Sequence, residues 1–280
     1  MLKTTCLIAL AAAPLAAGNA TDAPAADETP GVHVAFFSPA GPPAVLEGKE
    51  KFESIEYKTS DKHIVHAEFF APRKKKGRAP AVLLVHDAGS NAKHLNSVAE
   101  ALQRKGFAVL VPDLRGHGAS ISESYDWTKT ETVEDKAQTW TFAMRDLESS
   151  TNWLRDQSNV HNSNLSVVGV GAGSVLAARY AVRDENARAV ALIAPESEAF
   201  GFNMMKDIIE LGGLPVMIMA TNDHEKEATR IQSASAKAND GFEYVSFQRL
   251  KPKDENDVFS DKRLNTELSK FLEEQAMPKR

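Results

Sequence analysis

Apolar residues between positions 51 and 280 form short continuous runs that alternate with helically spaced stretches. Three of the continuous runs, residues 79–85, 107–112 and 165–168, are typical of parallel strands buried on both faces. Elsewhere apolar residues fall three or four positions apart, as they do along one face of a helix. This alternation predicts βαβ units, and therefore an α/β fold with a mostly parallel sheet and helices on both faces.

The same reading assigns the remaining elements. We expect a strand pair over residues 51–72 that turns at Ser60 and Asp61, and no regular element over residues 121–138. Further strands are predicted at residues 188–195, 215–220 and 242–250. Helices are predicted near residues 95–105, 140–154, 174–182, 203–211, 227–239 and 264–272.

The first 50 residues do not fit this pattern. Residues 1–20 contain a lysine, an apolar run and small residues ending at Ala20, which is typical of a signal peptide cleaved near that position. Residues 21–50 are interpreted as a linker and N-terminal extension, so the folded domain is expected to span residues 51–280. The protein is therefore predicted to be secreted or periplasmic, and no other segment is apolar enough to span a membrane.

Composition narrows the possible chemistry. The chain has 280 residues and a net charge of -5, so no overall basic field favours nucleic acid. Its single cysteine, Cys6, lies inside the predicted signal peptide. The exported chain would then have no disulfide, no thiol nucleophile and no cysteine metal ligand.

Four segments in order resemble the α/β-hydrolase superfamily. They are PAVLLVHDAGSN, VLVPDLRGHGAS, VVGVGAGSVLAARYA and LPVMIMATNDHEKEA, and the resemblance runs from about Lys51 to the C-terminus. It implies an α/β-hydrolase fold with about eight strands, similar to the secreted esterase and serine-aminopeptidase-like branch. In that superfamily the nucleophile is the third residue of Gly-x-Ser-x-Gly, on a sharp turn between a strand and a helix.

The nucleophile position in this sequence is Gly171, which has no reactive side chain. Glycine tolerates the strained backbone of such a turn at little steric cost. Ser174 is the fallback nucleophile, but it should lie in the first helical turn and point away from the apex of the turn.

The other catalytic positions also depart from the superfamily pattern. The acid position falls on His224, with Asp223 one residue earlier as the acid candidate. The histidine should lie between the last strand and the last helix, yet residues 251–262 contain carboxylates and Asn256 but no histidine. A serine without a base is a poor nucleophile.

The resemblance assigns the oxyanion-hole N–H groups to Ala88 and Ala172, which need no side chain for that role. We expect a residual pocket above Gly171 for a small carboxylate, phosphate or carbonyl group. An inward Asp87 carboxylate would oppose an anion there, and Asp87 stands where the superfamily usually has glycine. His86 and His117 should flank the floor of this pocket, either held by backbone hydrogen bonds or, with Asp87, around a metal ion.

The leading interpretation is an exported pseudo-hydrolase that keeps a pocket for a ligand or partner and needs no cofactor or metal. One alternative is an active ester or amide hydrolase that uses displaced residues, and another is a structural or partner-binding envelope protein. The candidate ligands are a small carboxylate or an ester-like molecule, and the sequence does not identify a protein partner. A dinucleotide-binding turn is disfavoured because its third glycine would have to stand at Ser174.

Overall fold

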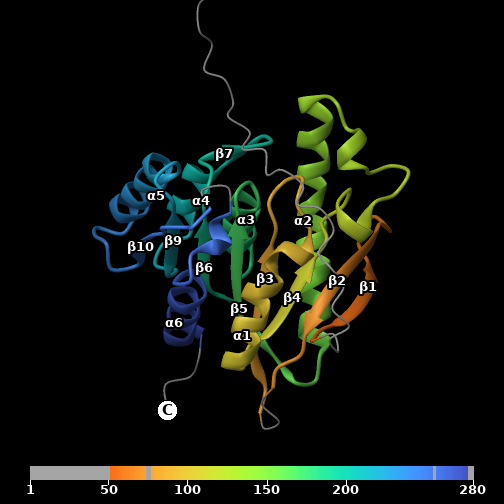
Figure 1. Cartoon of the computed structure of the whole chain (residues 1–280), viewed down its shortest axis with the longest axis horizontal. Helices are drawn as coiled ribbons and strands as arrows, with labels where there is room; N and C mark the ends of the chain where they lie inside the picture. Colours follow the sequence, from red (N-terminus) through yellow and green to blue (C-terminus); the bar gives the residue numbers. More distant parts are fainter. Residues whose placement is uncertain (1–50, 74–76, 255–256, 277–280) are drawn as a thin grey trace, which may run out of the picture. The chain divides into compact units, whose positions relative to one another are not determined.

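Eight strands form one sheet in the order β1-β2-β4-β3-β5-β6-β9-β10 (Figure 1). The computed structural model describes residues 51–73, 77–254 and 257–276, so the predicted signal peptide and linker lie outside the described residues. Pairs β1·β2 and β2·β4 are antiparallel and the other pairs are parallel. The strands of the sheet are β1 (Glu53–Lys58), β2 (Ile64–Phe70), β3 (Ala79–Val85), β4 (Ala108–Pro112), β5 (Val160–Val170), β6 (Ala187–Ile193), β9 (Val216–Ala220) and β10 (Val245–Arg249).

Helices cover both faces of this sheet. They are α1 (Asn96–Lys105), α2 (Val133–Asp156), α3 (Gly173–Arg183), α4 (Met204–Glu210), α5 (Glu225–Ala238) and α6 (Leu264–Ala276). Helices α1 and α6 pack on one face, and α2, α3, α4 and α5 on the other (Figure 1). Successive residues of β3 alternate between the two apolar clusters, since side chains along a strand point to opposite faces. The predicted α/β fold with about eight strands is confirmed.

Helix α2 departs from the sequence prediction because it begins at Val133, inside a stretch for which no helix was expected. The Thr132 side chain accepts a hydrogen bond from the backbone N–H of Asp135, which caps the first turn of the helix. Two short strands, β7 (Glu198–Ala199) and β8 (Phe202–Asn203), were also not predicted. They form a small hairpin that follows β6.

The parallel register places several loops at one edge of the sheet. Val85 at the end of β3 pairs with Gly169 of β5, and Gly169 pairs with Leu192 of β6. The residues that follow these three strands are therefore neighbours in space although they are far apart in sequence. Ligands of open α/β sheets bind at this carboxyl edge.

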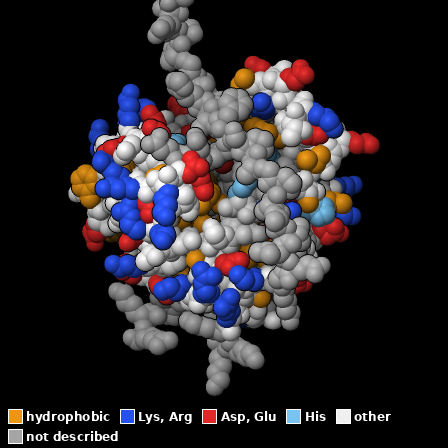
Figure 2. All heavy atoms as spheres, viewed as in Figure 1, with side chains coloured by type: hydrophobic (Ala, Val, Ile, Leu, Met, Phe, Trp, Pro, Cys, Tyr) orange, Lys and Arg blue, Asp and Glu red, His pale blue; other side chains and the backbone are white. Residues whose placement is uncertain are grey.

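The surface of the described residues carries mixed charge. On the face shown in Figure 2, basic and acidic side chains are interspersed rather than gathered by sign. Within the part of the chain that the structure describes, no helix is both long enough and apolar enough to cross a membrane.

Candidate functional site

Gly171 lies at the turn between β5 and α3, the position predicted for it. Its φ is +53°, in the left-handed region, and its N–H donates to the carbonyl of Ile193 on β6. A neighbouring glycine, Gly173, allows the helix to approach β3 closely: a Cβ atom there would lie 2.3 Å from the carbonyl oxygen of His86. The turn therefore keeps the tight geometry of a nucleophile elbow and carries no side chain at its apex.

The carboxylate of Asp87 fills the space above this apex. A Cβ atom on residue 171 would lie 2.3 Å from Cγ of Asp87, far inside van der Waals contact. Asp87 follows β3 directly, so its side chain reaches the turn from the neighbouring strand. In this conformation, a side chain on residue 171 and the carboxylate of Asp87 cannot both be present, because they would overlap.

The backbone N–H groups of Ala88 and Ala172 both donate to Asp87. The distances from the two nitrogens to Oδ1 are 2.8 Å and 2.7 Å, respectively. These are the two residues to which the superfamily resemblance assigns the oxyanion hole. The structure thus brings the two N–H groups together, and both donate to the same oxygen, Oδ1 of the Asp87 side chain. The residual pocket expected above Gly171 is occupied by Asp87.

Two carboxyl groups of the site have raised pKa values. Burial raises the pKa of Asp87 to about 6, although the hydrogen bonds from Ala172 and Ala88 act in the opposite direction. Burial, followed by the nearby charge of Asp87, raises the pKa of Glu196 to about 7. Sequence reasoning did not assign Glu196 to the site; the only available signal was an acidic residue shortly after the buried strand β6.

His86 and His117 are held by backbone hydrogen bonds on both ring nitrogens. In His86, Nδ1 donates to the carbonyl of Asp87 and Nε2 accepts from the N–H of Leu114. In His117, Nδ1 donates to the carbonyl of Arg115 and Nε2 accepts from the N–H of Gly89. Burial lowers the pKa of His86 to about 4 and that of His117 to about 3. Both rings are neutral and fix loops, with no nitrogen left to act as a base.

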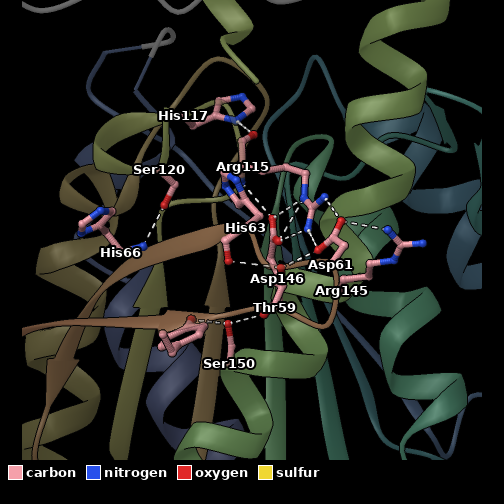
Figure 3. A network of polar contacts seen from close by, with 11 residues as sticks. Thr59, Asp61, His63, His66, Arg115, His117, Ser120, Arg145, Asp146 and Ser150 are labelled. Carbon is pink, nitrogen blue, oxygen red and sulfur yellow. Dashed lines mark hydrogen bonds and ion pairs between the residues drawn. The ribbon is translucent and has the colours of Figure 1, made fainter. Parts of the chain in front are cut away.

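Arg115 fixes the loop after β4 that carries His117. Its fully buried guanidinium pairs with Asp146 of α2 at 2.6 Å and with Asp61 of the β1–β2 turn at 2.8 Å. Figure 3 shows this guanidinium between the two carboxylates, while the Arg115 carbonyl faces His117. The ion pairs therefore position a backbone carbonyl that holds His117, which in turn holds the loop carrying Ala88.

Ser174 lies in the first turn of α3 with its side chain fully buried. Its hydroxyl donates to the carbonyl of Gly171 at 2.5 Å. The Ser174 side chain therefore stabilises the turn between β5 and α3 and does not point out of it. No histidine is hydrogen-bonded to it among the described residues.

Among the described residues, the candidate acid and the C-terminal loop make no hydrogen bond to Asp87, His86, His117 or Ser174. Asp223 is exposed on the turn after β9, while the neighbouring His224 contacts the Thr221 hydroxyl through Nδ1 at 2.9 Å. A hydrogen bond joins the two ends of the loop between β10 and α6, since Asp261 accepts from the N–H of Lys251 at 2.5 Å. Asn256 lies outside the described residues.

Aromatic rings line one side of the site. The ring centroid of Trp127 lies 4.7 Å from that of His117 and 5.1 Å from that of Phe200. Trp140, beside them, is fully buried. No group of three or more His, Cys, Asp or Glu side chains suited to a metal ion occurs in the described part of the chain.

Comparisons with known proteins assign the chain to a family. The family model described as the dienelactone hydrolase family matches residues 65–248. A search of curated protein sequences gives no significant match.

Several solved structures share the fold at low sequence identity. A dienelactone hydrolase from Anabaena variabilis is 15% identical, with a TM-score of 0.58, and the match covers 81% of this chain and 98% of that one. An esterase from Pyrococcus furiosus is 17% identical, with a TM-score of 0.62 and coverages of 84% and 96%. An acylaminoacyl peptidase from Pyrococcus horikoshii is 11% identical, with a TM-score of 0.63 and coverages of 83% and 43%. The predicted membership of the α/β-hydrolase superfamily is confirmed.

Proposed function

Because the chain belongs to the dienelactone hydrolase family, we propose that it is an exported, catalytically inactive member whose former active site serves in binding. One observation carries this proposal: the Asp87 carboxylate occupies the space of a nucleophile on Gly171 and takes up both oxyanion-hole N–H groups. Ester hydrolysis by this fold needs a nucleophile, a base and free oxyanion donors.

Three sets of contacts support the absence of this chemistry. Ser174 is fully buried and its hydroxyl is bound to the Gly171 carbonyl. His86 and His117 use both ring nitrogens on backbone groups, and no histidine follows His224 in the sequence. A carbonyl substrate would also meet the Asp87 carboxylate where its own oxygen should bind.

The test is labelling of the purified chain with a fluorophosphonate probe, together with turnover of 4-nitrophenyl acetate. The protein and its Ser174→Ala variant should show the same background rate and no labelling, while an active serine esterase assayed in parallel is labelled. Turnover that Ser174→Ala abolishes would establish the displaced-serine hydrolase instead. Turnover that survives Ser174→Ala and disappears in Asp87→Ala would establish a carboxylate-dependent hydrolase.

Export is the second part of the proposal and rests on residues 1–20. Their charged start, apolar run and small residues before Thr21 support cleavage after Ala20. Expression of the full chain in a bacterium, followed by mass spectrometry of the N-terminus, tests it. A mature chain beginning at Thr21 outside the cytoplasm is expected, and an intact Met1 in the cytoplasm would contradict export.

A further inference from the structure

The Asp87 carboxylate is bound as an anionic ligand would be bound. Two N–H groups from different elements, the loop after β3 and the start of α3, converge on Oδ1 at 2.8 Å and 2.7 Å. Such lengths are typical of charge-assisted hydrogen bonds. Among the described residues, no donor contacts the other oxygen, Oδ2. The carboxylate is therefore held through one oxygen, in a site whose donors belong entirely to the backbone.

We propose that Ala88 and Ala172 form a carboxylate-binding site that Asp87 occupies as an internal ligand, and that a small monocarboxylate from solution replaces Asp87 when Asp87 is protonated. This inference rests on the proposed function, since the site must contain no nucleophile. It adds the class of ligand and the condition under which the ligand enters. Exchange takes up one proton: the incoming group binds as an anion while the Asp87 carboxyl becomes neutral and leaves the two N–H groups.

At neutral pH the ionised Asp87 carboxylate competes with a dissolved carboxylate for the N–H groups of Ala88 and Ala172, and Asp87 prevails. Asp87 is tethered two bonds from its own backbone, so its effective concentration at Ala88 and Ala172 exceeds that of a dissolved acid at millimolar level. An added anion would also lie beside the ionised Asp87. Protonation removes both obstacles, because a neutral carboxyl is a weaker acceptor and repels nothing.

Other titratable groups lie on the loops at the same edge of the sheet. They include His86, His94, Asp113, His117, Glu196, Asp223 and His224. Burial keeps His86 and His117 neutral down to pH 5, since it lowers their pKa values to about 4 and about 3. Burial also lowers the pKa of His224. The Asp113 carboxylate accepts from the N–H groups of Ala92 and Ala119.

Glu196 acts in the same direction as Asp87. Burial and the charge of Asp87 raise its pKa to about 7, so it is neutral at pH 5 and ionised at pH 8. A bound carboxylate therefore meets no negative charge from either Asp87 or Glu196 in mild acid. Both groups oppose the ligand once the solution becomes alkaline.

The experiment follows the backbone amides of Ala88 and Ala172 in the isotopically labelled full chain during titration with sodium acetate, at pH 5.0 and pH 7.5 and constant ionic strength. In the wild type, the acetate anion should bind at pH 5.0 and roughly 30-fold more weakly at pH 7.5, following the fraction of Asp87 that is protonated at a pKa of about 6. Asp87→Ala should bind acetate at both pH values. Asp87→Asn should also bind acetate at both pH values, because its amide stays neutral, as the protonated Asp87 carboxyl does.

The matched control is Glu185→Ala, which removes an exposed carboxylate from the opposite edge of the sheet, before β6. It should reproduce the wild-type titration, so a change there would attribute the effect to net charge and overturn the proposal. Unmoved Ala88 and Ala172 amides in a folded Asp87→Ala variant at both pH values would also overturn it. So would equal acetate affinity of the wild type at both pH values. Ester turnover by the wild type would sink the proposed function without altering these shifts.

Discussion

The carboxylate of Asp87 occupies the volume that a side chain on residue 171 would need, with 2.3 Å between a Cβ atom there and Cγ of Asp87. A glycine at the apex and an acidic residue after β3 therefore depend on each other. The superfamily resemblance assigns the reverse arrangement, with a side chain at the apex and glycine after β3. In this chain the residue after β3, and not the residue at the apex, fills the site.

The first prediction tests this dependence by a double-mutant cycle. Gly171→Ser should lower the free energy of unfolding by about 2–3 kcal/mol, because the new side chain overlaps Asp87 and the residue keeps a positive φ. In an Asp87→Gly background the same substitution should cost at least about 1 kcal/mol less. Urea unfolding of the four proteins measures the coupling. Additive effects would show that the two side chains do not compete.

The second prediction concerns activity in the same double variant. Gly171→Ser with Asp87→Gly restores a hydroxyl at the apex and frees Ala88 and Ala172. Hydrolysis of 4-nitrophenyl acetate should still remain within about tenfold of the wild-type background, since no base activates the serine. A burst of product, or labelling by a fluorophosphonate, would reveal a base that the present contacts do not supply.

A third prediction follows from the raised pKa of Asp87. An acid with a raised pKa in the folded state destabilises the fold once it ionises, so its contribution is lost as the pH rises from about 4 through about 6. Asp87→Asn removes this loss and should be more stable than the wild type at pH 8, by about 2–3 kcal/mol at most.

The difference between Asp87→Asn and the wild type should vanish near pH 4, where both side chains are neutral. Chemical unfolding at a series of pH values measures it. Glu185→Gln, at an exposed position, serves as the control for the loss of one carboxylate. A stability difference that is independent of pH would contradict ionisation of Asp87 as its cause.

The fourth prediction separates two arginines that contact the same carboxylate. Arg115→Met leaves Asp146 buried without its cationic partner and should cost about 3–5 kcal/mol. Arg145 also pairs with Asp61 at 2.8 Å, but its side chain is 41% exposed, so Arg145→Met should cost no more than about 1 kcal/mol. Thermal unfolding compares the two variants. Equal losses would mean that burial of the Arg115 network adds nothing.

Much of the architecture follows from local patterns in the sequence. Continuous apolar runs separated by helically spaced residues predict the parallel sheet and the covering helices, because each element must bury its own apolar face. The start of α2 was missed because capping by Thr132 is a weaker signal than apolar periodicity. The glycine at position 171 and the lack of any histidine after His224 were also readable directly from the sequence.

Tertiary structure alone decided where the Asp87 side chain points. In the sequence Asp87 could equally have faced solvent; the register of β3 against β5 brings it over Gly171 and onto the N–H of Ala172, which lies 85 positions away. The partners of Arg115 and the raised pKa of Glu196 arise in the same way. Hydrophobic periodicity specifies which face of an element is buried, whereas contacts between polar groups at the ends of different strands depend on how those strands pack side by side.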